Sequence, residues 1–73
     1  MRRKEPLLVI GRNIEILRKE KKIKQFQLAA ICDLEKANLS RIESGETNTT
    51  ILTLLKISRG LDVPLGELFK EQS

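Results

Sequence analysis

The chain has 73 residues, 40% of them hydrophobic, and a formal net charge of +4 from 14 basic and 10 acidic side chains. This length and composition predict one small folded domain rather than a disordered tail. Histidine is absent and Cys32 is the only cysteine, which excludes an intrachain disulfide, a structural zinc site and Ser-His or Cys-His nucleophile pairs. We therefore expect no catalysis, no metal and no cofactor.

Aromatic residues are limited to two phenylalanines, which argues against stacking platforms for single-stranded nucleic acid. No apolar run approaches the roughly 18 residues that a membrane span requires. The apolar run at residues 7–10 is also shorter than the about 7–15 residues of a signal-peptide core. These patterns predict a cytoplasmic protein that does not contact a membrane.

The predicted elements begin with a helix over residues 7–22, because apolar residues recur from Ile10 at the i, i+4, i+7 spacing of one helical face. Gly11 is the one unfavourable residue inside this helix. Residues 1–6 are expected to form a basic arm, and residues 71–73 a frayed tail.

Two short amphipathic helices follow, over residues 25–32 and 36–44, with a tight turn at residues 33–34. Gly45 stands just past the second of them, where a positive φ is easily adopted. Such a pair, in a small basic domain, is what a protein needs to lay a short helix in the DNA major groove.

The remaining chain predicts a fourth helix over residues 50–60, capped by Thr49 or Thr50, and a fifth short helix over residues 64–69. The residues of the fifth helix that we expect to face inward are Leu65, Leu68 and Phe69. No strand-like alternation persists, so the pattern predicts a single all-α domain over residues 7–70.

Residues at fixed spacings in four of these helices carry a family resemblance: Gln25, Leu28-Ala29, Leu39-Ser40, Glu43-x-Gly45, Leu54-x-Lys56-Ile57 and Leu61-x-Val63-x-Leu65-x-x-Leu68-Phe69. Over about residues 10–69 the chain resembles the Cro/C1-type (XRE family) helix-turn-helix domains of phage repressors and bacterial regulators. The resemblance implies a five-helix lambda-repressor-like fold. It also implies sequence-specific binding of double-stranded operator DNA by a small homodimeric transcriptional regulator.

Four residues depart from the family pattern: Asp33 in place of a turn glycine, Glu35 in place of a capping Ser or Thr, Glu46 in place of Lys or Arg, and Thr49 in place of Pro. Aspartate tolerates a left-handed backbone better than most residues, so the turn can keep its shape. The two glutamates matter more, because both are expected near DNA phosphates.

The resemblance assigns base reading to the recognition helix at residues 36–44, through Lys36, Ala37, Asn38 and Arg41. Lys and Arg donate to guanine O6 and N7, Asn pairs with adenine, and Ala contacts a thymine methyl. The alternative interpretation is an ordinary solvated helix face.

The resemblance implies a phosphate contact from Gln25 at the start of the second helix, where orphan N–H groups attract anions, and Lys24 beside it adds positive charge. The alternative is a polar residue that faces water. Ser44 and Asn48 are weaker candidates. The resemblance further implies a largely buried ion pair between Arg18 and Glu43, which would hold the first helix against the third.

A recognition helix of about 12–14 Å reads too few base pairs alone, so two half-sites about 34 Å apart and a homodimer are expected. The favoured interface is residues 61–69 with help from the fourth helix, and its exposed apolar candidates are Val63, Leu65 and Phe69. A second possible interface consists of Leu7, Leu8 and Ile16 in the first helix.

Charge is distributed unevenly, with +6 over residues 1–24, −2 over residues 25–49 and 0 over residues 50–73. Phosphate attraction must therefore come mainly from the first helix, Lys24 and the arm, which predicts a modest salt slope of roughly 4 to 6 for a dimer. The negative middle segment leaves an alternative, namely an antitoxin-like or other protein-interaction module with weak DNA binding and a separate partner such as a toxin.

Overall fold

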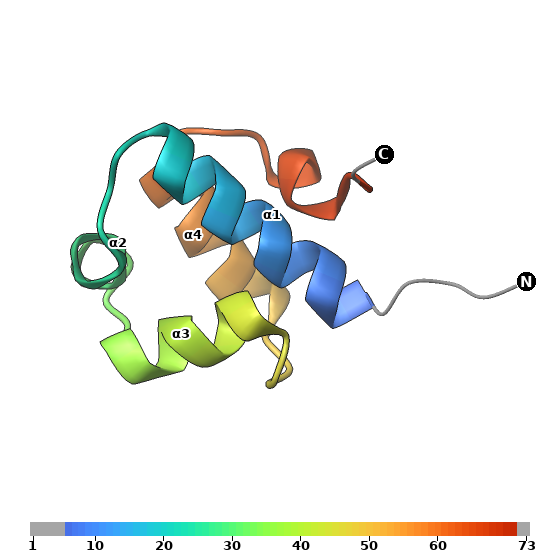
Figure 1. The fold of residues 1–73 in the computed structure, drawn as a ribbon, viewed down its shortest axis with the longest axis horizontal. Helices are drawn as coiled ribbons and strands as arrows, with labels where there is room; N and C mark the ends of the chain where they lie inside the picture. Colours follow the sequence, from blue (N-terminus) through green and yellow to red (C-terminus); the bar gives the residue numbers. More distant parts are fainter. Residues whose placement is uncertain (1–5, 72–73) are drawn as a thin grey trace, which may run out of the picture.

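The structure, a computed structural model, describes residues 6–71. The helices are α1 (Pro6–Glu20), α2 (Gln25–Ile31), α3 (Lys36–Ser44), α4 (Ile51–Leu61) and the 3-10 helix η1 (Leu65–Phe69). In Figure 1, α1 lies in front of α4, α2 is seen end-on at one side, α3 runs below, and η1 lies beside α1. The all-α helix-turn-helix fold predicted from the sequence is confirmed.

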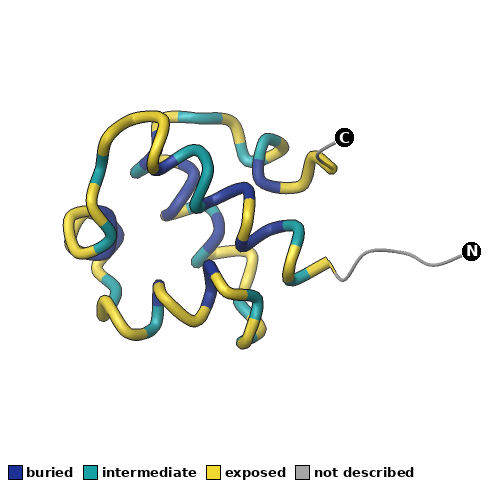
Figure 2. The backbone as a smooth tube through the Cα atoms, in the orientation of Figure 1, coloured by how far each residue is buried: buried dark blue, intermediate teal, exposed yellow. Residues whose placement is uncertain are grey.

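One apolar core joins all five elements, because each helix places its apolar stripe toward the centre. The buried apolar residues are Ile10, Ile14, Leu28, Ala29, Cys32, Leu39, Ile42, Leu54, Ile57, Leu61 and Leu68. Figure 2 shows these buried segments along the sides of the helices that face one another, with the outer sides exposed.

Several predicted boundaries were wrong by one or two residues. Pro6 belongs to α1 rather than to the arm, and the rest of the predicted arm lies outside the described residues. Helix α1 ends at Glu20 rather than residue 22, because Lys22 has a φ of 59° in the left-handed region. Helix α2 ends at Ile31, one residue before the predicted end.

The predicted fifth α-helix is a 3-10 helix. Its first turn is closed by an i→i+3 hydrogen bond, in which the Glu67 N–H donates to the Pro64 carbonyl at 3.0 Å. Phe69 was expected to face inward but is 42% exposed, whereas Leu68 is fully buried. A spacing of three residues per turn brings only part of this short segment onto the core.

All four α-helices end in the same way, with a left-handed residue followed by a backbone N–H that donates to the carbonyl five residues earlier. The left-handed residues are Lys22, Asp33, Gly45 and Asp62. After three of these ends, the next side chain is apolar and packs against the core, namely Ile23, Leu34 and Val63. Asp33, with a φ of 58°, therefore adopts the backbone that family members give to glycine.

Two contacts of α1 fix its neighbours. A Cβ at Gly11 would lie 2.5 Å from the Glu43 carbonyl oxygen and would also meet that of Ile42, so glycine lets α1 and α3 approach closely. The buried Asn13 amide donates to the carbonyls of Leu68, at 2.9 Å, and Lys70, at 2.6 Å. These hydrogen bonds from α1 to the C-terminal segment were not predicted from the sequence.

Candidate nucleic-acid interface

The exposed side of α3 is a continuous polar stripe. Its exposed residues are Lys36, Ala37, Ser40, Arg41 and Ser44. They recur at i, i+1, i+4, i+5 and i+8, which is one face of a helix, while Leu39 and Ile42 fill the opposite face. Three of the four predicted base readers thus share a surface, and Asn38 is half-buried at its edge.

Ser40 lies in the middle of this stripe and was not among the predicted contact residues. Its spacing of four residues from both Lys36 and Ser44 is the signal that identifies it. The stripe is flanked by Glu35, which provides no side-chain cap to α3, and by Glu46 after its end; both are exposed.

The start of α2 meets α3 at an open hollow of about 200 Å³, lined by Glu15, Gln25, Ser40, Glu43 and Ser44. Gln25 and Ser44, both predicted phosphate contacts, therefore border the same space. The Ser44 hydroxyl donates to the Arg41 carbonyl at 3.1 Å, so its hydrogen is used within α3. Lys24 is exposed beside Gln25, and Asn48 is exposed in the loop before α4.

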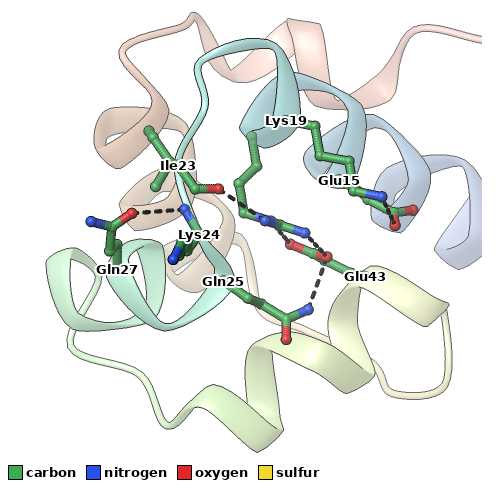
Figure 3. A network of polar contacts seen from close by, with 8 residues as sticks. Glu15, Lys19, Ile23, Lys24, Gln25, Gln27 and Glu43 are labelled. Carbon is green, nitrogen blue, oxygen red and sulfur yellow. Dashed lines mark hydrogen bonds and ion pairs between the residues drawn. The ribbon is translucent and has the colours of Figure 1, made fainter.

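Behind the hollow lies the predicted pair of Arg18 and Glu43, whose side chains are 10% and 5% exposed. Arg18 Nε donates to Glu43 Oε2 at 2.7 Å, and Arg18 Nη2 donates to Oε1 at 3.1 Å. Figure 3 shows that Gln25 and the Ile23 carbonyl belong to the same network. Because Arg18 neutralises Glu43, this carboxylate adds little negative charge to the α3 surface.

The exposed large apolar residues overlap only in part with those expected at an interface between protomers, because only Phe69 and Leu8 belong to both sets. They are Leu8, Phe26, Ile31, Ile51, Leu52 and Phe69. Val63 and Leu65, the other two interface candidates of residues 61–69, are half-buried and pack against the core of their own chain, as was also expected of Leu65. The fourth helix was expected to contribute to the interface, and Ile51 and Leu52 form an exposed apolar pair at its start.

Within residues 6–71 there is no cluster of three or more histidine, cysteine or acidic side chains that could hold a metal ion. No helix in the same range is long and apolar enough to cross a membrane. Cys32 is buried between α2 and α4; its thiol donates to the Lys56 carbonyl at 3.4 Å, and burial raises the pKa of this thiol.

Comparison with known proteins points to one family. A helix-turn-helix family model matches residues 14–68. The chain is 42% identical to the control protein C.MunI from Mycoplasma sp. over 62 residues, which is 84% of both proteins. It is 41% identical to the transcriptional regulator SlrR of Bacillus subtilis and 29% identical to the immunity repressor of Bacillus phage phi105, but spans less than half of each.

Solved structures show the same relationship. The restriction-modification controller protein C.AhdI from Aeromonas hydrophila superposes with a TM-score of 0.84 at 30% identity, over 86% of this chain and 96% of C.AhdI. The wild-type controller C.Esp1396I gives a TM-score of 0.82 at 31% identity, over 92% of this chain and 87% of that chain.

Proposed function

Since the chain belongs to the helix-turn-helix family of DNA-binding transcriptional regulators, we propose that it binds a specific operator as a homodimer, with α3 in the major groove. The observation that carries the proposal is the exposed stripe of α3, because Lys36, Ala37 and Arg41 offer base-reading chemistry on one face of a helix. Gln25 and Lys24 contact the flanking phosphates.

The role of a controller protein is the one best supported among the relatives. C.MunI matches over 84% of its own length, and C.AhdI over 96%, whereas SlrR and the phage repressor match over less than half. Regulation then depends on the concentration of the protein and on operator overlap.

Dimerisation would use Ile51 and Leu52 of α4 together with Phe69 of η1. These side chains are the exposed apolar residues of two elements that pack on each other. A domain of this size buries only about 60% of the surface of its unfolded chain, so covering an exposed apolar pair also stabilises the fold.

Selection of genomic fragments with the purified protein tests the proposal, followed by titration of the enriched duplex at two salt concentrations. We expect a two-fold symmetric site, and a loss of about 1–3 kcal/mol of binding free energy for Arg41→Ala. Arg59→Ala is the matched control, because it removes an exposed cation near the end of α4, about two turns away from Leu52 and outside α2 and α3.

Binding without site preference, or an equal loss for Arg59→Ala, contradicts the proposal. It would favour a protein-interaction module, for which the exposed Glu35 and Glu46 at the two ends of α3 are the supporting observation.

A further inference from the structure

Glu43 makes three hydrogen bonds through its two carboxylate oxygens. Arg18 occupies Oε2 at 2.7 Å and shares Oε1 at 3.1 Å, while Gln25 Nε2 donates to Oε1 at 3.0 Å. Arg18 is itself held from the other side, because its Nη1 donates to the Ile23 carbonyl at 2.9 Å. The carboxylate is therefore fixed in place before any ligand arrives.

This fixed carboxylate determines which way the Gln25 amide faces. A carboxylate only accepts hydrogen bonds, so the amide must turn its NH₂ group, and not its carbonyl oxygen, toward Glu43. Figure 3 shows the Gln25 side chain extending from the start of α2 to Glu43 of α3 in this orientation. An amide nitrogen carries two hydrogens, and Glu43 Oε1 accepts only one of them.

Gln25 lines the hollow together with Ser40 and Ser44 of the recognition helix, and its second Nε2 hydrogen is left for an acceptor outside the Glu43 network. We propose that Glu43 is a positioning residue, which locks the Gln25 amide so that its second N–H donates to a DNA phosphate oxygen. The inference rests on the proposed function, since it concerns the phosphate contact of that complex. If the amide were released, it could rotate and present its carbonyl oxygen to the phosphate, which repels it.

The arrangement also explains how a buried acid can lie beside a phosphate site. Arg18 offsets the Glu43 charge, and Lys19 Nζ lies 3.0 Å from Oε2 of Glu15, the other acid that lines the hollow. An amide that is already oriented loses less conformational freedom on binding than one that is free to rotate.

NMR of the side-chain amides in the unmodified protein tests this inference directly. The two Nε2 hydrogens of Gln25 give separate signals, and the duplex enriched by genomic selection is the probe. We expect the hydrogen bonded to Glu43 to keep its chemical shift on binding, and the other to move downfield. Gln27 of the same helix is the internal control, because its carbonyl oxygen accepts from the Lys24 N–H at 2.8 Å, outside the Glu43 network.

The inference is overturned if the Gln25 signals move no more than those of Gln27 while α3 signals shift. It is equally overturned if the hydrogen bonded to Glu43 loses that bond. Absence of any shift in α3 is a separate result, because it contradicts the proposed function itself.

Binding measurements with two substitutions give a second test. Gln25→Ala should weaken binding about tenfold, which corresponds to about 1.4 kcal/mol. In a Glu43→Gln background the same substitution should weaken binding less than about threefold, because an amide at position 43 can present a donor or an acceptor to Gln25 and no longer fixes the orientation of its side chain. Equal effects in both backgrounds contradict the proposal. If Glu43→Gln fails to fold, the NMR experiment on the unmodified chain still decides.

Discussion

At the scale of single residues, Arg18 and Glu43 are the two buried charged residues within residues 6–71. Both side chains are at most one-tenth exposed, and their bonds join α1, α2 and α3. A buried ion pair gains little over a well-packed apolar pair, but removing one partner leaves a charge without compensation. Substitution of either Arg18 or Glu43 is therefore expected to disturb the packing of the three helices.

Arg18→Met should lower the free energy of unfolding by about 3–5 kcal/mol, because Glu43 would remain buried without its cation. Urea denaturation followed by circular dichroism measures the change. Lys19→Met is the control, since it breaks the exposed i,i+4 pair with Glu15 and should cost about 0.3–0.5 kcal/mol. A similar cost for both substitutions would show that the buried pair is not specially important.

At the scale of the helix, each of the four α-helices is followed closely by a residue with a left-handed backbone. Only one of the four left-handed positions is a glycine, so three side chains tolerate this backbone at some cost. The left-handed backbone is least favourable at Lys22, because lysine lacks the short polar side chain that makes Asp tolerant of it.

Lys22→Gly should therefore stabilise the protein by about 1 kcal/mol, and raise its melting temperature by about 4–8 °C. Lys21→Gly, at the preceding exposed position without a positive φ, should give no gain. Thermal unfolding of the two variants side by side measures the difference. A gain from both would point to an effect of lost lysine charge instead.

The close contact between α1 and α3 depends on the absence of a side chain at Gly11. A methyl group there meets two backbone carbonyls, so Gly11→Ala should push the helices apart and cost about 1–3 kcal/mol despite the better helix propensity of alanine. Gly66→Ala is the control, because a Cβ there meets nothing within 4 Å. Chemical denaturation compares them, and an unchanged stability of the Gly11 variant would refute the close approach.

At the scale of the whole molecule, the proposed dimer should respond to the apolar pair of α4. Leu52 is 72% exposed, so Leu52→Glu leaves the folded protomer intact but places a charge in the proposed interface. We expect sedimentation to show a shift to monomer, and operator binding to weaken with it.

Ile31→Glu, on the exposed side of α2, is the matched control for this experiment, because Ile31 is 60% exposed and lies outside the proposed interface. Dissociation by Ile31→Glu but not by Leu52→Glu would move the interface to α2. Dissociation by neither would place it on other residues.

Sequence by itself determined the order and type of the α-helices, because apolar periodicity and helix-ending residues act within a few positions along the chain. The recognition helix was predicted with its observed bounds at residues 36–44. The family resemblance implied the pair of Arg18 and Glu43, whose Nε and Oε2 atoms the structure brings to 2.7 Å. The family resemblance supplied the fold, which the matched structures confirm.

Tertiary structure alone decided which apolar residues stay exposed and what each polar group meets. Periodicity defines an apolar face, but only the neighbouring elements decide whether that face is covered. Val63 and Leu65 are therefore packed against the core, whereas Ile51 and Leu52 remain in solvent. The bond from Gln25 to Glu43 and the closeness of Gly11 to α3 likewise depend on distances between helices, which no local pattern of residues encodes.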